Sequence, residues 1–175
     1  MKTSVFIAAS LDGFIARKDG SIDWLSEFES ADVFTSYDEF IKRIDAIVIG
    51  RGTFETVLAF RSWPYKKPVF VLSKTIHDVP DNLREKAEVV AMKPGELLDY
   101  LSSKGHSNLY IDGGKVIQSF LTEDLIDEMT ITKVPVLIGG GIPLFDVLDR
   151  DLQFQHMETK VYSNGLVRSR YERNR

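Results

Sequence analysis

The sequence predicts a single α/β domain over residues 1–175, with a mostly parallel central sheet, helices on both faces and a final antiparallel hairpin. Three observations predict this fold class. Short runs rich in valine and isoleucine recur along the chain, as they do in buried strands. Segments with apolar residues at helical spacing lie between these runs. Near the end, Ser163-Asn164-Gly165 separates two strand-like segments, and Asn-Gly in such a place is a strong hairpin signal.

Six apolar runs are predicted as buried strands because each combines a strand-like length with β-branched residues. They are Val5–Ala9, Ala46–Ile49, Val69–Leu72, Val89–Met92, Leu109–Ile111 and Met129–Ile138. The first run follows Met1-Lys2 and superficially resembles a signal peptide. It is too short for one, and Asp12 and Arg17 follow at once, so we expect a buried first strand.

Four segments between the strands have helical spacing. They are Phe34–Ile44, Thr53–Phe60, Glu96–Ser103 and Lys115–Leu121. Strands that alternate with helices predict a parallel sheet covered on both faces. The two strands of the final hairpin are predicted at Phe154–Tyr162 and Leu166–Tyr171.

Composition narrows the function classes. The 175 residues carry a net charge of −4, with 43% hydrophobic and 27% charged residues, which is ordinary globular usage. The acidic balance argues against nucleic acid as a general partner. Cysteine is absent and the three histidines are far apart, so neither a thiol nucleophile nor a metal site is expected. No apolar stretch approaches the roughly 20 residues of a membrane helix, so a cytoplasmic protein is expected. The partner that we expect is a small-molecule substrate.

Two glycine loops are placed where a ligand should bind. Gly50-Arg51-Gly52-Thr53 follows one predicted strand and opens a helix, and Gly113-Gly114-Lys115-Val116 repeats this arrangement. Free backbone N–H groups at a helix N-terminus favour anions, so the two loops could hold the two ends of a dinucleotide. Neither loop is a GxGxxG fingerprint or a P-loop. The alternative is that these glycines only make tight turns.

A possible phosphate clamp lies at the end of the third predicted strand. Leu72 is followed there by Ser73 and Lys74, which supply a hydroxyl and an ammonium group. Arg51 at a helix start is unfavourable for the helix dipole, and a bound phosphate would explain it. Together Arg51, Ser73 and Lys74 could hold a ribose 2′-phosphate, which favours NADP over NAD. The alternative is ordinary surface charge.

Acidic residues near the first strand are candidates for proton transfer. Hydride transfer to an imine-like substrate requires one proton donor, for which Asp12 is the first candidate and Asp23 the second. Asp12-Gly13 is also a turn signal, and Trp24 beside Asp23 either covers a flat ring or anchors the core. A third glycine loop, which includes Gly140 and Gly141, either faces the substrate or lets the chain bend.

An ordered series of motifs resembles the dihydrofolate reductase fold, and most closely the C-terminal reductase domain of the bacterial riboflavin biosynthesis protein RibD. The motifs cover almost the whole chain. They are Ser10-Leu11-Asp12-Gly13-x-Ile15-Ala16, Asp23-Trp24, Val48-Ile49-Gly50-Arg51-x-Thr53-x-Glu55, Val71-Leu72-Ser73, Ile111-x-Gly113-Gly114, and Pro135-x-x-x-Gly139-Gly140-Gly141-x-Pro143-Leu144-Phe145.

This resemblance implies a three-layer dihydrofolate reductase-like fold, NADPH as hydride donor and a homodimer. It implies that the backbone of Ala9 and the side chain of Ile15 lie against the nicotinamide, and that Trp24 lies near the substrate. It assigns the phosphates and the adenosine end to the following residues: Gly50, Arg51, Gly52 and Thr53; Leu72, Ser73 and Lys74; Gly113, Gly114, Lys115 and Val116.

The predicted activity is reduction of a pyrimidine- or pterin-like heterocycle, foremost 5-amino-6-(5-phosphoribosylamino)uracil. The acids after Trp24 do not align clearly with the pterin-binding acid of folate reductases, so dihydrofolate reduction is an alternative. A non-catalytic protein that binds or senses NADPH is a second alternative, because fold does not fix function.

Overall fold

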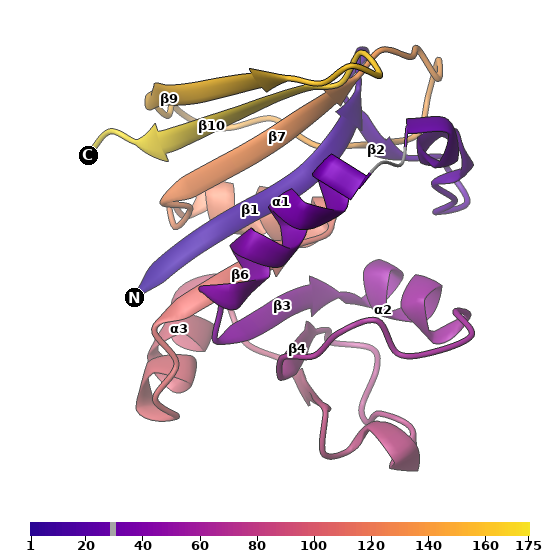
Figure 1. The fold of residues 1–175 in the computed structure, drawn as a ribbon. Helices are drawn as coiled ribbons and strands as arrows, with labels where there is room; N and C mark the ends of the chain where they lie inside the picture. Colours follow the sequence, from indigo (N-terminus) through magenta and orange to yellow (C-terminus); the bar gives the residue numbers. More distant parts are fainter. Residues whose placement is uncertain (29–30) are drawn as a thin grey trace.

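The computed structural model describes residues 1–28 and 31–175, including the side chains of all of these except residues 31–33. Its main sheet has eight strands, which are β1 (Lys2–Ser10), β3 (Ala46–Gly50), β4 (Val69–Leu72), β5 (Ala87–Val90), β6 (Asn108–Asp112), β7 (Glu128–Val134), β9 (Phe154–Val161) and β10 (Val167–Arg173). Their order across the sheet is β5-β4-β3-β6-β1-β7-β10-β9 (Figure 1). The first six of these are parallel, and β10 is antiparallel to both of its neighbours.

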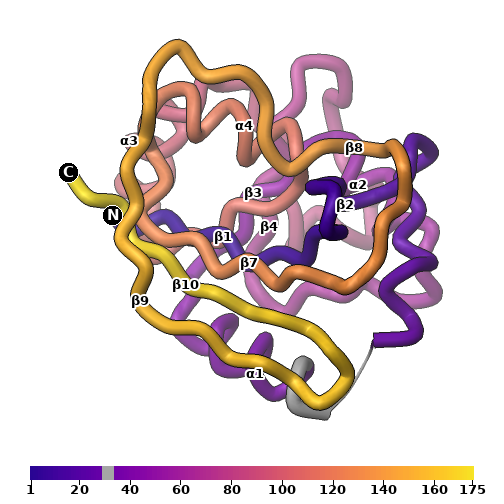
Figure 2. The backbone as a smooth tube through the Cα atoms, turned by 90° about the horizontal axis from the view of Figure 1, so that it is seen from above, coloured from indigo at the N-terminus to yellow at the C-terminus, as the bar shows by residue number. Residues whose placement is uncertain are grey.

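Helices cover both faces of this sheet. They are α1 (Ala31–Lys42), α2 (Arg51–Leu58), α3 (Pro94–Ser103) and α4 (Gly114–Thr122), with short 3-10 turns η1 (Asp23–Phe28) and η2 (Asp81–Leu83). Along β3, Ala46 and Val48 pack in the cluster that contains α3 and α4, whereas Ile47 and Ile49 pack in the cluster that contains α1 and α2. This period of two is the signature of a strand buried on both faces. Figure 2 shows α1 on one side of the sheet and α3 and α4 on the other.

The predicted fold class is confirmed, with some changes at strand boundaries. The predicted strand Met129–Ile138 ends at Val134, because Pro135 lacks an N–H to continue the ladder. The Val136 N–H instead donates to the Val134 carbonyl at 2.7 Å and closes a tight turn. The predicted strand Val89–Met92 is displaced two residues toward the N-terminus.

The final hairpin is also confirmed. β9 and β10 pair antiparallel, and Gly165 between them has φ +86°, which glycine adopts without strain. A second, two-stranded ladder was not predicted. It pairs β2 (Phe14–Ala16) with β8 (Ile142–Pro143), and both strands are too short to give a sequence pattern.

One part of the sheet positions the candidate site. β3 and β6 are parallel neighbours, and Ile49 is in register with Asp112 at their carboxyl ends. The glycine loops that follow these strands therefore leave the sheet side by side. Among the described residues, no helix is long and apolar enough to cross a membrane.

Candidate functional site

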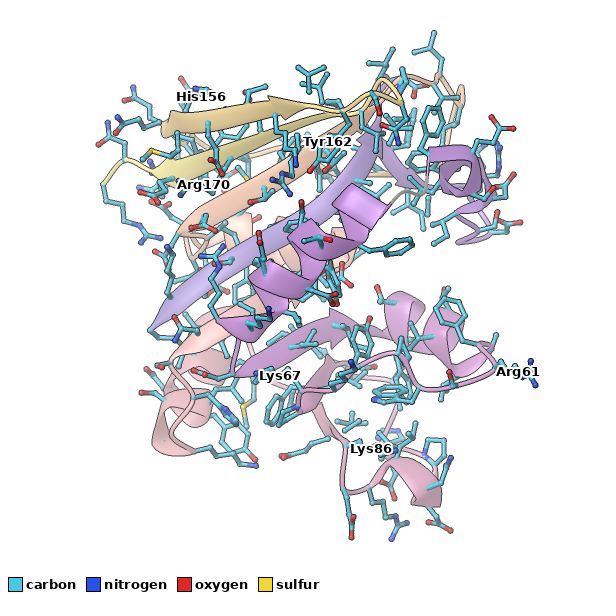
Figure 3. All side chains as sticks on the ribbon, viewed as in Figure 1. Arg61, Lys67, Lys86, His156, Tyr162 and Arg170 are labelled. Atoms are coloured by element: carbon cyan, nitrogen blue, oxygen red, sulfur yellow. The ribbon has the colours of Figure 1, made fainter. Side chains whose placement is uncertain are left out.

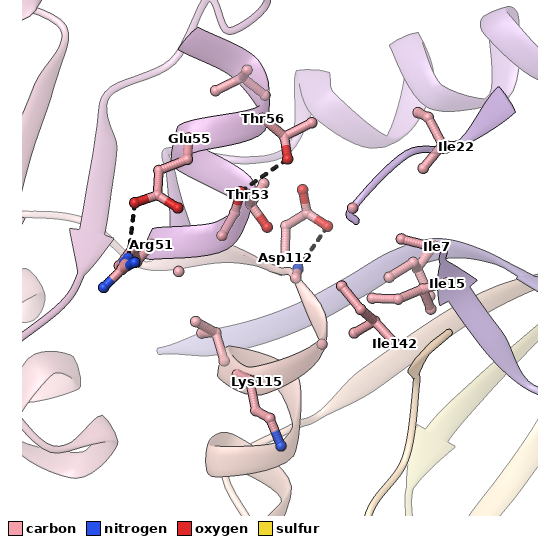
Figure 4. A pocket seen from close by; sticks show the side chains of 18 of the residues that line it. Ile7, Ile15, Ile22, Arg51, Thr53, Glu55, Thr56, Asp112, Lys115 and Ile142 are labelled. Carbon is pink, nitrogen blue, oxygen red and sulfur yellow. Dashed lines mark hydrogen bonds and ion pairs between the residues drawn. The ribbon is translucent and has the colours of Figure 1, made fainter. Parts of the chain in front are cut away.

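A cavity of about 1260 Å³ opens at the carboxyl ends of β1, β3, β4 and β6 (Figure 4). This is the edge at which open parallel sheets bind ligands. The cavity brings together twelve residues of the predicted cofactor set, which are Ile15, Gly50, Arg51, Gly52, Thr53, Leu72, Ser73, Lys74, Gly113, Gly114, Lys115 and Val116. Ala9, the thirteenth, is fully buried, and its neighbour Ala8 lines the cavity instead.

The two glycine loops pack directly against each other. A Cβ atom at Gly50 would lie 2.9 Å from the Val116 side chain, and one at Gly113 would collide with the Thr53 hydroxyl. Gly113 also has φ +91°, which a residue with a side chain adopts only under strain. Glycine is therefore required at both positions for the two loops to approach so closely.

Helices α2 and α4 begin at these loops, with Gly50 and Gly113 as their N-cap residues. Neither N-cap has a side chain that could accept hydrogen bonds from the first turn. The first backbone N–H groups of a helix have no partner within the helix, and the helix dipole adds positive potential there. Two such ends side by side can hold a doubly anionic group such as a pyrophosphate.

The Arg51 side chain extends from the start of α2 toward the loop after β4. Its Nε donates to the Glu55 carboxylate at 2.8 Å, and its guanidinium also donates to the Thr75 hydroxyl at 3.2 Å. The Ser73 hydroxyl accepts the N–H groups of Thr75 and Ile76 at 3.2 and 3.1 Å, so it organises this turn. Lys74, which stands between Ser73 and Thr75 in the chain, is exposed and lines the cavity.

The other end of the cavity is apolar. Ile7 from β1, Ile15 from β2 and Ile142 from β8 gather there (Figure 4). A Cβ at Gly114 would lie 3.1 Å from the side chains of both Ile15 and Ile142, so this end is closely packed against α4. Such a surface suits one face of a flat, uncharged ring.

Asp112 is a site residue that sequence reasoning missed. It ends β6, lines the cavity, and accepts the Gly113 N–H at 2.9 Å. Burial raises the pKa of its carboxyl from 3.8 to about 6, although the Gly113 N–H and the hydroxyls of Tyr110 and Tyr65 act in the opposite direction. The available signal was an acid directly after a buried apolar run and directly before a glycine loop.

Three tyrosines surround this carboxyl on the cavity wall. Burial and the charge of Asp112 raise the pKa of Tyr37 to about 12 and raise those of Tyr65 and Tyr110 further above the ordinary value. All three hydroxyls are therefore protonated at neutral pH and can donate hydrogen bonds. The Tyr110 hydroxyl donates to the Phe6 carbonyl at 2.9 Å.

The two predicted proton donors do not line this cavity. Asp12 accepts the Ser10 hydroxyl at 2.5 Å and the Gly139 N–H at 2.8 Å, and the Ser10 hydrogen bond foremost lowers its pKa. Asp23 is exposed and bound by Arg17 at 2.6 and 3.1 Å, which lowers its pKa as well. Carboxyls with lowered pKa values do not donate protons near neutral pH, so this geometry argues against the role predicted for both residues.

The predicted substrate-binding residues also lie outside the cavity wall. Trp24 is buried against Val134, Tyr162 and Leu166, which is the core-anchor alternative. Gly140 and Gly141 do not line the cavity, and a Cβ at Gly141 would collide with the backbone carbonyl of Ala16. The close approach of Gly141 to Ala16 favours the alternative that this loop lets the chain bend past β2, and the substrate role of the two glycines stays a prediction.

Comparison with known proteins places this chain in a family. A family model described as the RibD C-terminal domain matches residues 2–168. The chain belongs to the RibD C-terminal domain family. The uncharacterized protein YwjB of Bacillus subtilis (strain 168) is 36% identical to this chain over 170 residues, which cover 94% of each chain.

Solved structures agree with this assignment. A putative riboflavin biosynthesis protein from Shewanella sp. PV-4 is 46% identical, with a TM-score of 0.95 and complete coverage of both chains. The diaminohydroxyphosphoribosylaminopyrimidine deaminase/5-amino-6-(5-phosphoribosylamino)uracil reductase of Thermotoga maritima has a TM-score of 0.77 at 17% identity, over 99% of this chain and 56% of that chain.

Dihydrofolate reductase from Enterococcus faecalis, complexed with NADP(H), has a TM-score of 0.70 at 20% identity, over 99% of this chain and 97% of that chain. The similarity confirms that this RibD C-terminal domain has a dihydrofolate reductase-like fold. At 20% identity this similarity shows the fold alone and not the activity, because one fold hosts many functions.

Proposed function

We propose that this RibD C-terminal domain is an NADPH-dependent reductase that transfers hydride to a flat nitrogen heterocycle of the pyrimidine or pterin class. The observation that carries the proposal is the pair of uncapped helix N-termini, α2 and α4, side by side in one cavity. That pair suits a pyrophosphate, and the cavity continues from it in two directions. One end reaches Arg51 and Lys74, and the other reaches the apolar wall at Ile15.

The cavity has room where the proposal needs it. A Cβ atom at Gly52 would meet no atom within 4 Å, so the first turn of α2 faces open space. The main-chain N–H groups of this turn and of Gly114 and Lys115 would hold the phosphates. Arg51 and Lys74 would hold a 2′-phosphate on the adenosine ribose.

The bound nicotinamide would supply a hydride to an electrophilic ring or imine carbon of the substrate. The nitrogen of the reduced C=N bond then needs one proton. We assign this proton to Asp112, because its carboxyl lines the cavity and its pKa of about 6 leaves a useful protonated fraction near neutral pH. The apolar wall at Ile7 and Ile15 would exclude water from the hydride path.

The first substrate to test is 5-amino-6-(5-phosphoribosylamino)uracil, because the Thermotoga relative is named for a reductase of this compound. Its ring-opened tautomer carries a C=N bond between the exocyclic nitrogen and the first sugar carbon, which would take the hydride at carbon and the proton at nitrogen. Dihydrofolate is the second, because the fold is shared with a dihydrofolate reductase. The homodimer that the family resemblance implies stays a prediction.

Cofactor preference tests the proposed phosphate clamp. Arg51→Ala should weaken NADPH binding about 10- to 150-fold, since a hydrogen bond to a charged group contributes about 1.5–3 kcal/mol. Binding of NADH, which lacks the 2′-phosphate, should change less than threefold. Arg84→Ala is the matched control, because Arg84 is exposed and paired with Asp78 and Asp81 at 3.0 Å but does not line the cavity.

Replacement of Glu55 tests the same phosphate clamp, with an expected change in NADPH affinity of the opposite sign. Its carboxylate now pairs with Arg51, and a 2′-phosphate would compete with it for the same guanidinium. Glu55→Gln should therefore tighten NADPH binding about two- to fivefold, the range for releasing an exposed ion pair. Equal effects of the Arg51 and Glu55 variants on NADPH and NADH would remove the phosphate assignment. NADPH binding without oxidation by any heterocycle would favour the non-catalytic alternative.

A further inference from the structure

Strand β9 forms an outer edge of the main sheet. In the part of the chain that the structure describes it pairs only with β10 (Figure 2). All its residues except Phe154 are exposed. The strand at the opposite edge, β5, has four residues, and all of them are buried or half-buried. Strand β9 therefore presents a row of backbone N–H and C=O groups to solvent, where another strand can pair.

The usual protection of such an edge is weak in β9. Natural edge strands are kept apart by proline, by shortness, by bulges or by charges of one sign. Strand β9 has eight residues and no proline. Its one register shift against β10 lies at Arg170 and Tyr171, so the ladder from Glu158 to Val161 is regular. Its two charged residues in this stretch, Glu158 and Lys160, have opposite signs.

These two charges lie on the face of β9 that is turned toward α1. Glu158 accepts a hydrogen bond from Arg170 at 3.3 Å, and Arg170 shares the buried Glu128 with Arg43 of α1. Lys160 lies on the same face, because alternate residues of a strand share a face. Its ammonium group lies over an aromatic ring, 4.8 Å from the centre, and has no carboxylate partner within the described chain.

The other face of β9 carries no acid and no lysine or arginine. A ring nitrogen of His156 lies 2.7 Å from the Thr159 hydroxyl, so these two side chains share a face. His156 and Arg170 lie on opposite faces of the hairpin (Figure 3). Met157 and Val161 share the face of Thr159 and are 40% and 70% exposed. Apolar side chains are thus open to solvent on both sides of Thr159.

The sequence of β9 is complementary to itself about Thr159. In an antiparallel pair of two β9 strands with a two-fold axis at Thr159, Glu158 of each copy lies opposite Lys160 of the other. Met157 likewise lies opposite Val161. An axis at Glu158 or Lys160 would instead set like charges directly opposite each other, which is unfavourable. An axis between two residues would oppose side chains that belong to different faces.

From this pattern we propose that β9 pairs antiparallel with β9 of a second copy of this chain, centred on Thr159. The two main sheets then continue into each other across a two-fold axis, and the same surface of each copy forms the interface. The family resemblance implies only a homodimer, whereas this inference names the strand and its register. It does not depend on the proposed reductase function, because no residue of β9 lines the cavity.

Single-cysteine variants test the register. The natural chain has no cysteine, so each introduced thiol is the only one. Residues directly opposite in an antiparallel pair have Cα atoms about 4.5–5.5 Å apart, which suits a disulfide. Thr159→Cys should therefore form a covalent dimer under mild oxidation. Gln155→Cys is the matched control, because this exposed residue would lie about 27 Å from its copy at about 3.4 Å per residue.

A mixed pair of variants tests the same register independently. Met157→Cys and Val161→Cys should each stay uncrosslinked alone and form a disulfide when mixed, since each residue lies opposite the other. Crosslinking of Met157→Cys alone would place the axis two residues away and overturn the centre at Thr159.

Charge exchange tests the ion pairs by sedimentation equilibrium. Glu158→Lys should weaken the dimer about tenfold or more, because lysines then face each other twice across the axis. Glu158→Lys/Lys160→Glu exchanges the two signs and should restore the dissociation constant to within about threefold of the wild type. Glu172→Lys is the matched control, because Glu172 pairs with the same Arg170 at 2.7 Å but lies on β10, which has a strand on both sides.

The outcomes either support or overturn this interface. A strand pair buries little area, so we expect a dissociation constant on the order of 10 µM. A wild type that stays monomeric at about 300 µM would overturn the proposal, since that is far above the value expected for a small interface. Equal crosslinking of Thr159→Cys and Gln155→Cys, or an exchanged variant as weak as Glu158→Lys, would overturn it as well. NADPH affinity should be the same in all these variants, so failure of the proposed function is read separately.

Discussion

Replacement of Asp112 by asparagine should make the protein more stable and less active. The folded protein holds the Asp112 proton up to a pH of about 6, whereas an unfolded chain releases it near 3.8. Between these values the folded state binds more protons than the unfolded state, so the free energy of unfolding falls as the pH rises. Above pH 6 the wild type therefore retains a constant penalty for its buried carboxylate, and asparagine has none.

The size of the effect follows from the shift in pKa. A rise of about two units corresponds to about 3 kcal/mol at pH 8, which is an upper limit because the cavity admits solvent. Asparagine keeps the oxygen that accepts the Gly113 N–H, so little is lost in exchange. Urea unfolding at pH 8 should show the variant more stable by about 1–3 kcal/mol, with the difference vanishing below about pH 4.

The activity of the same variant completes the prediction. An amide cannot donate the proton, so kcat should fall about 10²- to 10⁴-fold while NADPH affinity stays unchanged. The wild-type kcat should fall as the pH rises through the pKa of this carboxyl. Asp12→Asn is the matched control, because Asp12 lies outside the cavity wall. A variant that is less stable than the wild type at pH 8, or that keeps full activity, would refute the reasoning.

Two further predictions concern the framework of the site. Gly113→Ala should destabilise the fold by about 2–4 kcal/mol, since φ +91° strains a side chain by about 1–3 kcal/mol and its Cβ collides with Thr53. In urea unfolding, a Thr53→Ala background should relieve the collision alone, and full recovery there would contradict the strain. Glu128→Ala should cost about 3–5 kcal/mol at pH 7, because this buried carboxylate pairs with Lys2 at 2.9 Å and with Arg43. Desolvation of the Glu128 carboxyl is outweighed by hydrogen bonds from Arg43 and Lys2, so its pKa is lowered in the folded protein. The stability difference between wild type and variant should therefore shrink as the pH falls through this lowered pKa. A stability difference that does not change with pH would contradict the assignment.

Local sequence patterns predicted the elements but not their placement. The run at Ala46–Ile49 ends at a glycine, so its strand and the following helix could be recognised from the sequence. The position of β6 between β3 and β1 could not, because it depends on pairing between segments far apart in the chain. The two glycine loops at the cavity were nevertheless recognised in the sequence, since both follow the strand-then-glycine pattern.

The candidate proton donors could not be recognised in the same way. Asp12 looked suitable because it follows the first strand, but its carboxylate is used to hold the amides of residues 138 and 139. Burial raises the pKa of Asp112, and the Gly113 N–H and the hydroxyls of Tyr110 and of Tyr65, from the loop after α2, lower it in part. The place of Asp112 between a buried run and a glycine loop is visible in the sequence, but its burial and its tyrosine neighbours are not, because they come from segments far apart in the chain.

The most direct test of the account is whether a nicotinamide dinucleotide occupies the two glycine loops. NADPH is titrated into isotope-labelled protein, and the backbone amide signals of the glycines are followed by nuclear magnetic resonance. The account predicts that the signals of Gly50, Gly52, Gly113 and Gly114 move together and saturably, while that of Gly165 in the distant hairpin turn does not. Saturable binding that leaves these four amides unmoved, or no binding of NADPH at all, would contradict it.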